Sequence, residues 1–305
     1  MSLKGLINYY FYGKQGKADY TVHSMPQNRR QLFGEVMKVR WSAMFGVNLL
    51  YMVGWIPAII WTFINAAALL ANELDIAEVS GLVSTYLLVM VPLVTITGPF
   101  NAGATYVLRN WARDEHSFVF SDFKDAMKAN WKQGLAVAFI DGAVPVLVYT
   151  GWQFYGGMLS RSPVFALAIG LILMVALMWT LSSMLAFPML ITYNLKLKDV
   201  LRNCVLLTIA KLPFAILIKL ATLVVPAAAF ALLWMIPSIQ MQVLMIVVLL
   251  YLFFLVAFNK LITVSYANWL CETFINPRSE GAKTDIGLRP KDWDDTQYLP
   301  EDDEP

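Results

Sequence analysis

The chain has 305 residues, of which 58% are hydrophobic and only 14% are charged, and its formal net charge is +2. An average soluble domain carries about 25% charged residues, so this composition excludes an ordinary soluble protein. The few basic segments fit anionic lipid headgroups better than nucleic acid, and no nucleic-acid partner is expected.

Six long apolar stretches predict transmembrane helices. A helix needs about 20 mostly apolar residues to cross about 30 Å of hydrocarbon. The stretches are continuous rather than alternating, which favours helices over a barrel. The expected spans are Trp41–Leu70, Gly81–Val107, Gly134–Gly157, Pro163–Tyr193, Leu212–Ile236 and Met241–Lys260. The predicted fold class is therefore all-α, a polytopic protein in a lipid bilayer.

Positive charge falls almost entirely on alternate connections between these spans. Residues 1–40 hold seven lysines or arginines, and the segments 109–132 and 196–211 hold nine more. The connections at 71–80 and 237–240 hold none. The positive-inside rule therefore predicts that both termini and the two basic loops are cytoplasmic.

Composition divides the chain into three parts. A basic and aromatic segment, residues 1–40, is expected in the cytoplasm, partly on the membrane surface. Residues 41–275 form the expected six-helix transmembrane domain. Residues 276–305 contain prolines, few apolar residues and many charges, and are expected to form a disordered acidic cytoplasmic tail.

The connection between the second and third spans predicts an amphipathic helix. Apolar and basic residues fall on different faces there, which suits the inner membrane surface or a cytoplasmic partner. The residues of this expected partner-contact helix are Phe120, Phe123, Lys124, Met127, Lys128, Trp131 and Lys132. The alternative is a helix that simply leads into the third span. A segment similar to residues 124–128 recurs at 198–202, before the fifth span, and predicts a second such helix within a repeated hairpin.

Three charged residues fall inside the expected spans. Asp141 lies seven residues after Gly134, while Lys219 and Lys260 lie in the cytoplasmic thirds of the last two spans. An ionisable residue within a membrane is costly and by default suggests function. Asp141 paired with Lys219 or Lys260 would form an intramembrane polar site. The alternative is that both lysines extend to the headgroups while Asp141 caps local backbone.

Signals for catalysis are missing from the sequence. There is no Walker A motif, no HExxH and no nucleophile elbow. His23 and His116 are far apart in sequence, and Cys204 and Cys271 are expected to remain reduced thiols near the cytoplasm. We therefore expect no enzyme activity, no catalytic residue, no metal and no cofactor. The sequence gives no oligomeric state.

Two blocks of glycine, proline and polar residues keep a recognisable order. The first covers 97–110, 112–116, 122–124 and 128–133, and the second covers 187–190, 201–203 and 210–213. Together they resemble the YesL family (domain of unknown function 624), integral membrane proteins mostly of Gram-positive bacteria. The motif residues singled out are Gly98, Pro99, Arg109, Glu115, Asn130, Pro188, Asn203 and Pro213.

The resemblance implies a bacterial cytoplasmic-membrane protein, often encoded beside ABC-type carbohydrate importers. The first hypothesis is therefore a non-enzymatic accessory protein that contacts importer permease subunits. The second is an autonomous transporter or channel that uses the intramembrane Asp/Lys site. A third is a lipid-interacting or regulatory protein, suggested only by the basic inner face.

Overall fold

The computed structural model describes residues 25–278 and 281–290, and its long elements are helices. Four of these helices, each continuous, are α2 (Arg29–Ala71), α3 (Ile76–Trp111), α5 (Trp131–Met158) and α6 (Phe165–Thr192). A fifth is α8 (Leu212–Met235). The sixth is composite and consists of α9 (Gln240–Leu250), the π-helical segment η3 (Tyr251–Leu255) and α10 (Val256–Phe274). Six helices are long and apolar enough to cross a membrane, which confirms the predicted fold class.

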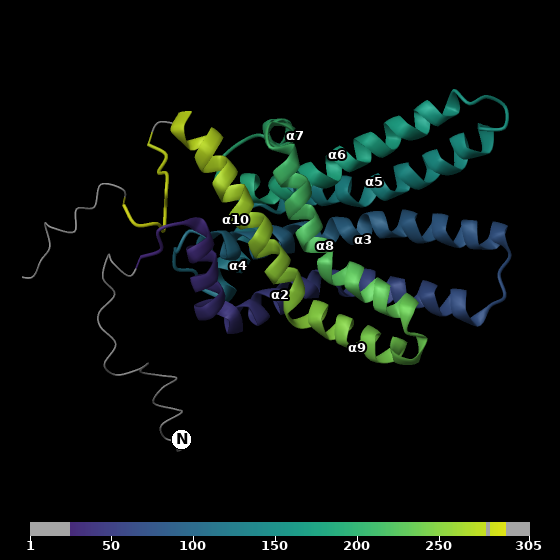
Figure 1. Ribbon diagram of the computed structural model, residues 1–305, viewed down its shortest axis with the longest axis horizontal. Helices are drawn as coiled ribbons and strands as arrows, with labels where there is room; N and C mark the ends of the chain where they lie inside the picture. Colours follow the sequence, from purple (N-terminus) through teal and green to yellow (C-terminus); the bar gives the residue numbers. More distant parts are fainter. Residues whose placement is uncertain (1–24, 279–280, 291–305) are drawn as a thin grey trace, which may run out of the picture.

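The six long helices form three hairpins (Figure 1). The turns of the α2–α3 and α5–α6 hairpins lie at one end of the bundle, whereas α4, α7 and the end of α10 lie toward the other. Helix α3 is central, because it packs against α2, α4, α5, α6 and α10. The two short helices are α4 (Val119–Ala129) and α7 (Leu197–Ala210).

The outer faces of the long helices are apolar and uncovered. In α8, for example, Leu217, Val224 and Phe230 are all more than 60% exposed. Such side chains would be hidden in a soluble protein, but hydrocarbon chains cover them at no cost in a bilayer. The chain is therefore a multi-pass membrane protein.

Helix α2 begins earlier than its apolar pattern does. Asn28 caps its first turn, because the Asn28 side chain accepts hydrogen bonds from the backbone amides of Arg30 and Gln31. Residues 29–40, which were assigned to a separate segment, therefore continue into the first span as one helix. Residues 1–24 of that segment lie outside the described part of the chain.

The two short helices occupy equivalent places in the chain. A single residue separates each short helix from the long helix that follows it: Asn130 lies between α4 and α5, and Lys211 lies between α7 and α8. Ala126 and Val200, which correspond in the proposed repeat, are both buried against the bundle. The same arrangement, a short helix followed by one linking residue and a long helix, thus occurs twice.

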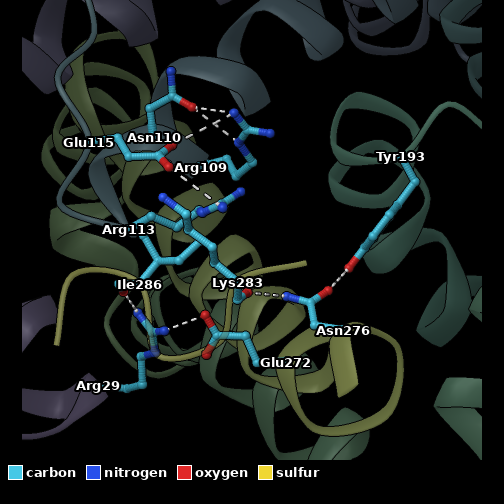
Figure 2. Close-up of polar contacts among 10 residues, drawn as sticks. All are labelled: Arg29, Arg109, Asn110, Arg113, Glu115, Tyr193, Glu272, Asn276, Lys283 and Ile286. Carbon is cyan, nitrogen blue, oxygen red and sulfur yellow. Dashed lines mark hydrogen bonds and ion pairs between the residues drawn. The ribbon is translucent and has the colours of Figure 1, made fainter. Parts of the chain in front are cut away.

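A segment assigned to a disordered tail is partly ordered. Residues 281–290 lie against the start of α2 and the end of α10, as Figure 2 shows. The Arg29 guanidinium pairs with Glu272 and donates to the Ile286 carbonyl oxygen at 2.6 Å. Asn276 donates to the Lys283 carbonyl oxygen at 2.9 Å. The predicted disorder is therefore wrong for residues 276–278 and 281–290, because hydrogen bonds to their backbone compensate for their low apolar content. Residues 291–305 lie outside the described part of the chain.

Candidate functional site

A cavity of about 280 Å³ lies among the long helices. Asp141 of α5, Lys219 of α8 and Lys260 of α10 all line it, so the structure brings the three sequence-predicted charges together. They come from two hairpins, because α8 and the composite helix that contains α10 form one hairpin and α5 belongs to another. The polar residues beside them include Asn101, Thr105, Ser183, Thr222, Asn259 and Thr263.

Asp141 contacts neither lysine directly. Its Oδ1 atom accepts a hydrogen bond from Trp179 Nε1 of α6 at 2.9 Å. Within the described residues no ion pair of 4.0 Å or less joins Asp141 to Lys219 or Lys260. The carboxylate is therefore held by a side chain from the neighbouring helix, and its Oδ2 atom has no hydrogen-bond partner in this part of the chain.

Lys260 is held by a neutral oxygen and aromatic faces. Its ammonium donates to Asn101 Oδ1 of α3 and lies 4.6 Å from the centroid of the Tyr51 ring. The Phe187 ring lies on the same ammonium at 5.9 Å. Cation–π contacts offset part of the desolvation cost but do not neutralise the charge. The Lys260 side chain thus faces the cavity rather than extending to the headgroups.

Threonines fix the backbone that carries both lysines. Thr222 Oγ1 donates to the Lys219 carbonyl oxygen at 2.7 Å, and Thr263 Oγ1 donates to the Lys260 carbonyl oxygen at 2.9 Å. Asn259 Nδ2 joins the two helices by donating to the Thr222 carbonyl oxygen at 3.3 Å. The same lysine-to-threonine spacing of three residues therefore occurs on α8 and α10.

The π-helical segment Tyr251–Leu255 sets the rotation of α10 relative to α9. Such a segment leaves backbone groups without their usual helical partners. Asn48 of α2, which is fully buried, supplies them: its Nδ2 donates to the carbonyl oxygens of Tyr251 at 2.9 Å and Leu252 at 2.7 Å. Its Oδ1 accepts from the Ala257 amide at 2.8 Å. Tyr251, the first residue of this segment, and Lys260, which follows the segment on α10, both line the cavity.

Sequence reasoning gave Asn48, Asn101 and Trp179 no part in the Asp/Lys site. The asparagines carried a signal, because an amide side chain inside an apolar span must find a partner in the protein. Trp179 carried none, since tryptophan is ordinary in a membrane helix. Its role depends on which face of α6 meets α5, and that follows from helix packing.

The predicted partner-contact helix is split between two environments. Phe123 is 4% exposed and packs edge-on against Phe100, and Met127 packs against the same core. Phe120 is 67% exposed and Trp131 is 48% exposed. On α4 the exposed residues of this set are Phe120, Lys124 and Lys128, while Phe123 and Met127 hold α4 to the bundle. The predicted helix is divided at Asn130, so Trp131 and Lys132 are exposed in the first turn of α5 instead.

The motif residues are spread over the structure rather than gathered in one place. Gly98, which precedes Pro99 in α3, lies against Gly134 where α3 and α5 touch. The carbonyl oxygen of Asn130 accepts a hydrogen bond from the Gly134 amide. Arg109 reaches Glu115 at 3.9 Å and hydrogen-bonds the Asn110 side chain (Figure 2). Pro188 lines the polar cavity, Asn203 lies on α7, and Pro213 stands in the first turn of α8.

The two cysteines are free and buried. Cys204 Sγ lies 3.6 Å from Met189 Sδ, inside the apolar cluster beneath α7. Burial raises the pKa of the Cys204 thiol to about 12, and nearby Cys271 acts in the same direction. A thiol with so high a pKa is a poor nucleophile at neutral pH. In the described residues no three His, Cys, Asp or Glu side chains gather as a metal site would require.

These features define a polytopic helical membrane protein with a polar cavity among its spans. Residues 41–152 match a sequence family described as a protein of unknown function, DUF624. The match covers α2 from residue 41, all of α3 and α4, and α5 through residue 152, so it includes Asp141 but neither Lys219 nor Lys260. No curated protein and no solved structure matches the chain.

Proposed function

We propose that this protein binds a small polar solute in the cavity around Asp141 and carries it across the membrane without enzymatic chemistry. The observation that carries the proposal is the convergence of Asp141, Lys219 and Lys260 on one cavity within the spans. On insertion scales a charged residue at the centre of a span costs about 2.5–3.5 kcal/mol. Three such residues on one cavity are difficult to explain as scaffolding, because apolar side chains would pack there at lower cost.

The proposed setting is a bacterial cytoplasmic membrane with both termini inside. The basic segments 109–132 and 196–211 support this orientation, since they would then lie in the cytoplasm. In the bundle these segments carry α4 and α7, at the end opposite the α2–α3 and α5–α6 turns (Figure 1). The cavity would be reached from either side as helices move relative to one another.

Replacing Asp141 with asparagine is expected to lower solute flux about tenfold or more, because one hydrogen bond to a charged group is worth about 1.5–3 kcal/mol. The measurement is uptake of labelled neutral, anionic and cationic solutes into liposomes that contain only this chain. Asp141→Asn keeps the size of the side chain and an acceptor for Trp179.

Asp199→Asn is the matched control, since Asp199 is exposed on α7. It should transport like the unmodified protein. Equal flux for Asp141→Asn and the unmodified chain, with equal thermal stability, would refute transport through this cavity.

A second candidate function is an accessory role in ABC-type carbohydrate uptake. It is supported by the resemblance to the YesL family and by the exposed face of α4. Phe120, Lys124 and Lys128 are exposed on α4, and Trp131 and Lys132 are exposed in the first turn of α5, directly after Asn130. A permease subunit of a sugar importer is the partner that this proposal names.

Charge reversal of Lys124, Lys128 and Lys132 to glutamate is expected to reduce recovery of the permease several-fold when the tagged chain is purified in mild detergent. Like charges opposed across an interface repel, and wrong pairings cost several kcal/mol. The matched control reverses Lys196, Lys198 and Arg202, which are exposed on and just before the equivalent helix α7. Unchanged recovery after the α4 reversal, or equal loss with both triple variants, would argue against α4 as the contact.

A further inference from the structure

We propose that the cavity around Asp141 binds a small hydroxylated monocarboxylate. This inference rests on the proposed solute-binding function and names the class of solute. It follows from the balance of charge around the cavity, from the hydrogen-bonding groups that remain unused, and from the size of the space.

The charge balance calls for one negative charge. Two basic side chains, Lys219 and Lys260, line the cavity, and Asp141 is the one acidic residue among its described lining residues. When both lysines are protonated and Asp141 is ionised, one positive charge has no counter-ion in a setting of low dielectric. An anion of single charge would neutralise it, whereas a neutral solute would leave the charge uncompensated and a dianion would reverse its sign.

The lysines have donors to offer such an anion. An ammonium group has three N–H donors. Lys260 uses one of them on Asn101 Oδ1, and the Lys219 ammonium has no hydrogen-bond partner in the described part of the chain. Both groups line one cavity, so one carboxylate could accept from both. Hydrogen bonds between ionised partners are about twice as strong as neutral ones.

The remaining groups suit hydroxyls. The free Oδ2 atom of Asp141 accepts but cannot donate when ionised, so it calls for a hydroxyl or amine of the solute. The hydroxyls of Ser183 and Thr105 also line the cavity. Each already donates within the protein, Ser183 to the Thr180 carbonyl oxygen and Thr105 to Asn101 Oδ1, so their oxygens remain as acceptors for hydroxyls of the solute. An amine on the solute would restore the uncompensated positive charge, which favours hydroxyl groups. A volume of about 280 Å³ lies near the lower end of the usual range of about 300–1,000 Å³ for small-molecule sites, so the solute is small.

Isothermal titration calorimetry on the full chain in nanodiscs tests this assignment. The probes form two matched pairs: gluconate with glucitol, and glycerate with glycerol. Each pair shares its carbon count and hydroxyl chemistry but differs in the carboxylate. We expect at least one acid to bind at least about tenfold more tightly than its neutral counterpart, because each charge-assisted hydrogen bond is worth about that factor. Sodium chloride at the same ionic strength is included in every titration, so simple halide binding cannot produce the difference.

Lys260→Gln and Lys219→Gln are each expected to weaken binding of that acid about tenfold or more. Lys198→Gln, on the exposed face of α7, is the control and should bind normally. Size-exclusion profiles and thermal midpoints show whether each variant is folded. If Lys260→Gln fails to fold, Lys219→Gln carries the test, because the Lys219 ammonium holds no contact that folding needs.

Two outcomes would overturn the proposal. Equal binding of an acid and its alcohol would reject the monocarboxylate while leaving a solute-binding cavity in place. Binding of neither pair would reject it as well. If Asp141→Asn flux is also normal, the proposed function fails together with it, so the two failures are distinguishable.

Discussion

Replacing Gly98 with alanine is expected to destabilise the protein by about 3 kcal/mol or more. A Cβ atom at position 98 would lie 2.2 Å from the Gly134 carbonyl oxygen and 2.5 Å from its carbonyl carbon. Both are backbone atoms of α5, so no side chain can rotate away and the helices must separate. Overpacking of this kind typically costs about 1–3 kcal/mol and more where backbone must move. The measurement is the thermal midpoint of the purified chain in detergent.

Gly170→Ala is the matched control, because Gly170 also lies within a long helix but a Cβ there meets nothing within 4 Å. Alanine is the better helix former by about 1 kcal/mol, so this variant should be as stable as the unmodified chain or slightly more so. If Gly98→Ala and Gly170→Ala unfold at the same temperature, the close approach of α3 and α5 is not what stabilises this part of the bundle.

The spans were predictable because each depends on its own composition. The fifth apolar stretch was assigned to Leu212–Ile236, and α8 covers Leu212–Met235. A segment that enters hydrocarbon must satisfy its backbone within itself, so a long apolar run has few structures available. No knowledge of the neighbouring helices is needed for such a prediction.

The ends of the first and last spans were not predictable in this way. The sixth apolar stretch ends at Lys260, but the helix continues to Phe274. Its polar residues Tyr266 and Asn268 are buried against the bundle, and they sit in the helix because protein rather than lipid surrounds them. Hydropathy measures how well a segment dissolves in lipid. It therefore does not predict the part of a helix that is surrounded by protein.

The candidate site was predictable in part. The depth of Asp141, Lys219 and Lys260 along their spans suggested a common location, and the cavity gathers all three. The direct aspartate–lysine pair was expected as one alternative, yet Trp179 holds Asp141 and Asn101 holds Lys260. These partners depend on how the helices are rotated against one another, and a single sequence does not carry that information.

Replacing Asn48 with leucine is the second large effect, with an expected loss of several kcal/mol. The substitution keeps the volume of the side chain but removes three hydrogen bonds, to Tyr251, Leu252 and Ala257. A buried polar group left unpaired costs about 1–3 kcal/mol, and three backbone groups are affected. Asn48 is fully buried, so the loss falls in the interior of the bundle. The measurement is again the thermal midpoint in detergent.

Asn65→Leu separates this role from the general effect of removing an amide. Asn65 lies on the same helix, but its side chain donates only to Trp61 one turn earlier, so its loss leaves no π-helical group unpaired. We expect Asn65→Leu to cost about 1 kcal/mol at most.

The Asn48 variant should also lose solute flux wherever it remains folded, since relaxation of Tyr251–Leu255 to a regular helix would turn Tyr251 relative to Lys260. Normal flux and an unchanged midpoint for Asn48→Leu would mean that the π-helical segment holds its shape without Asn48, and that the cavity owes its geometry to the packing of α10 alone.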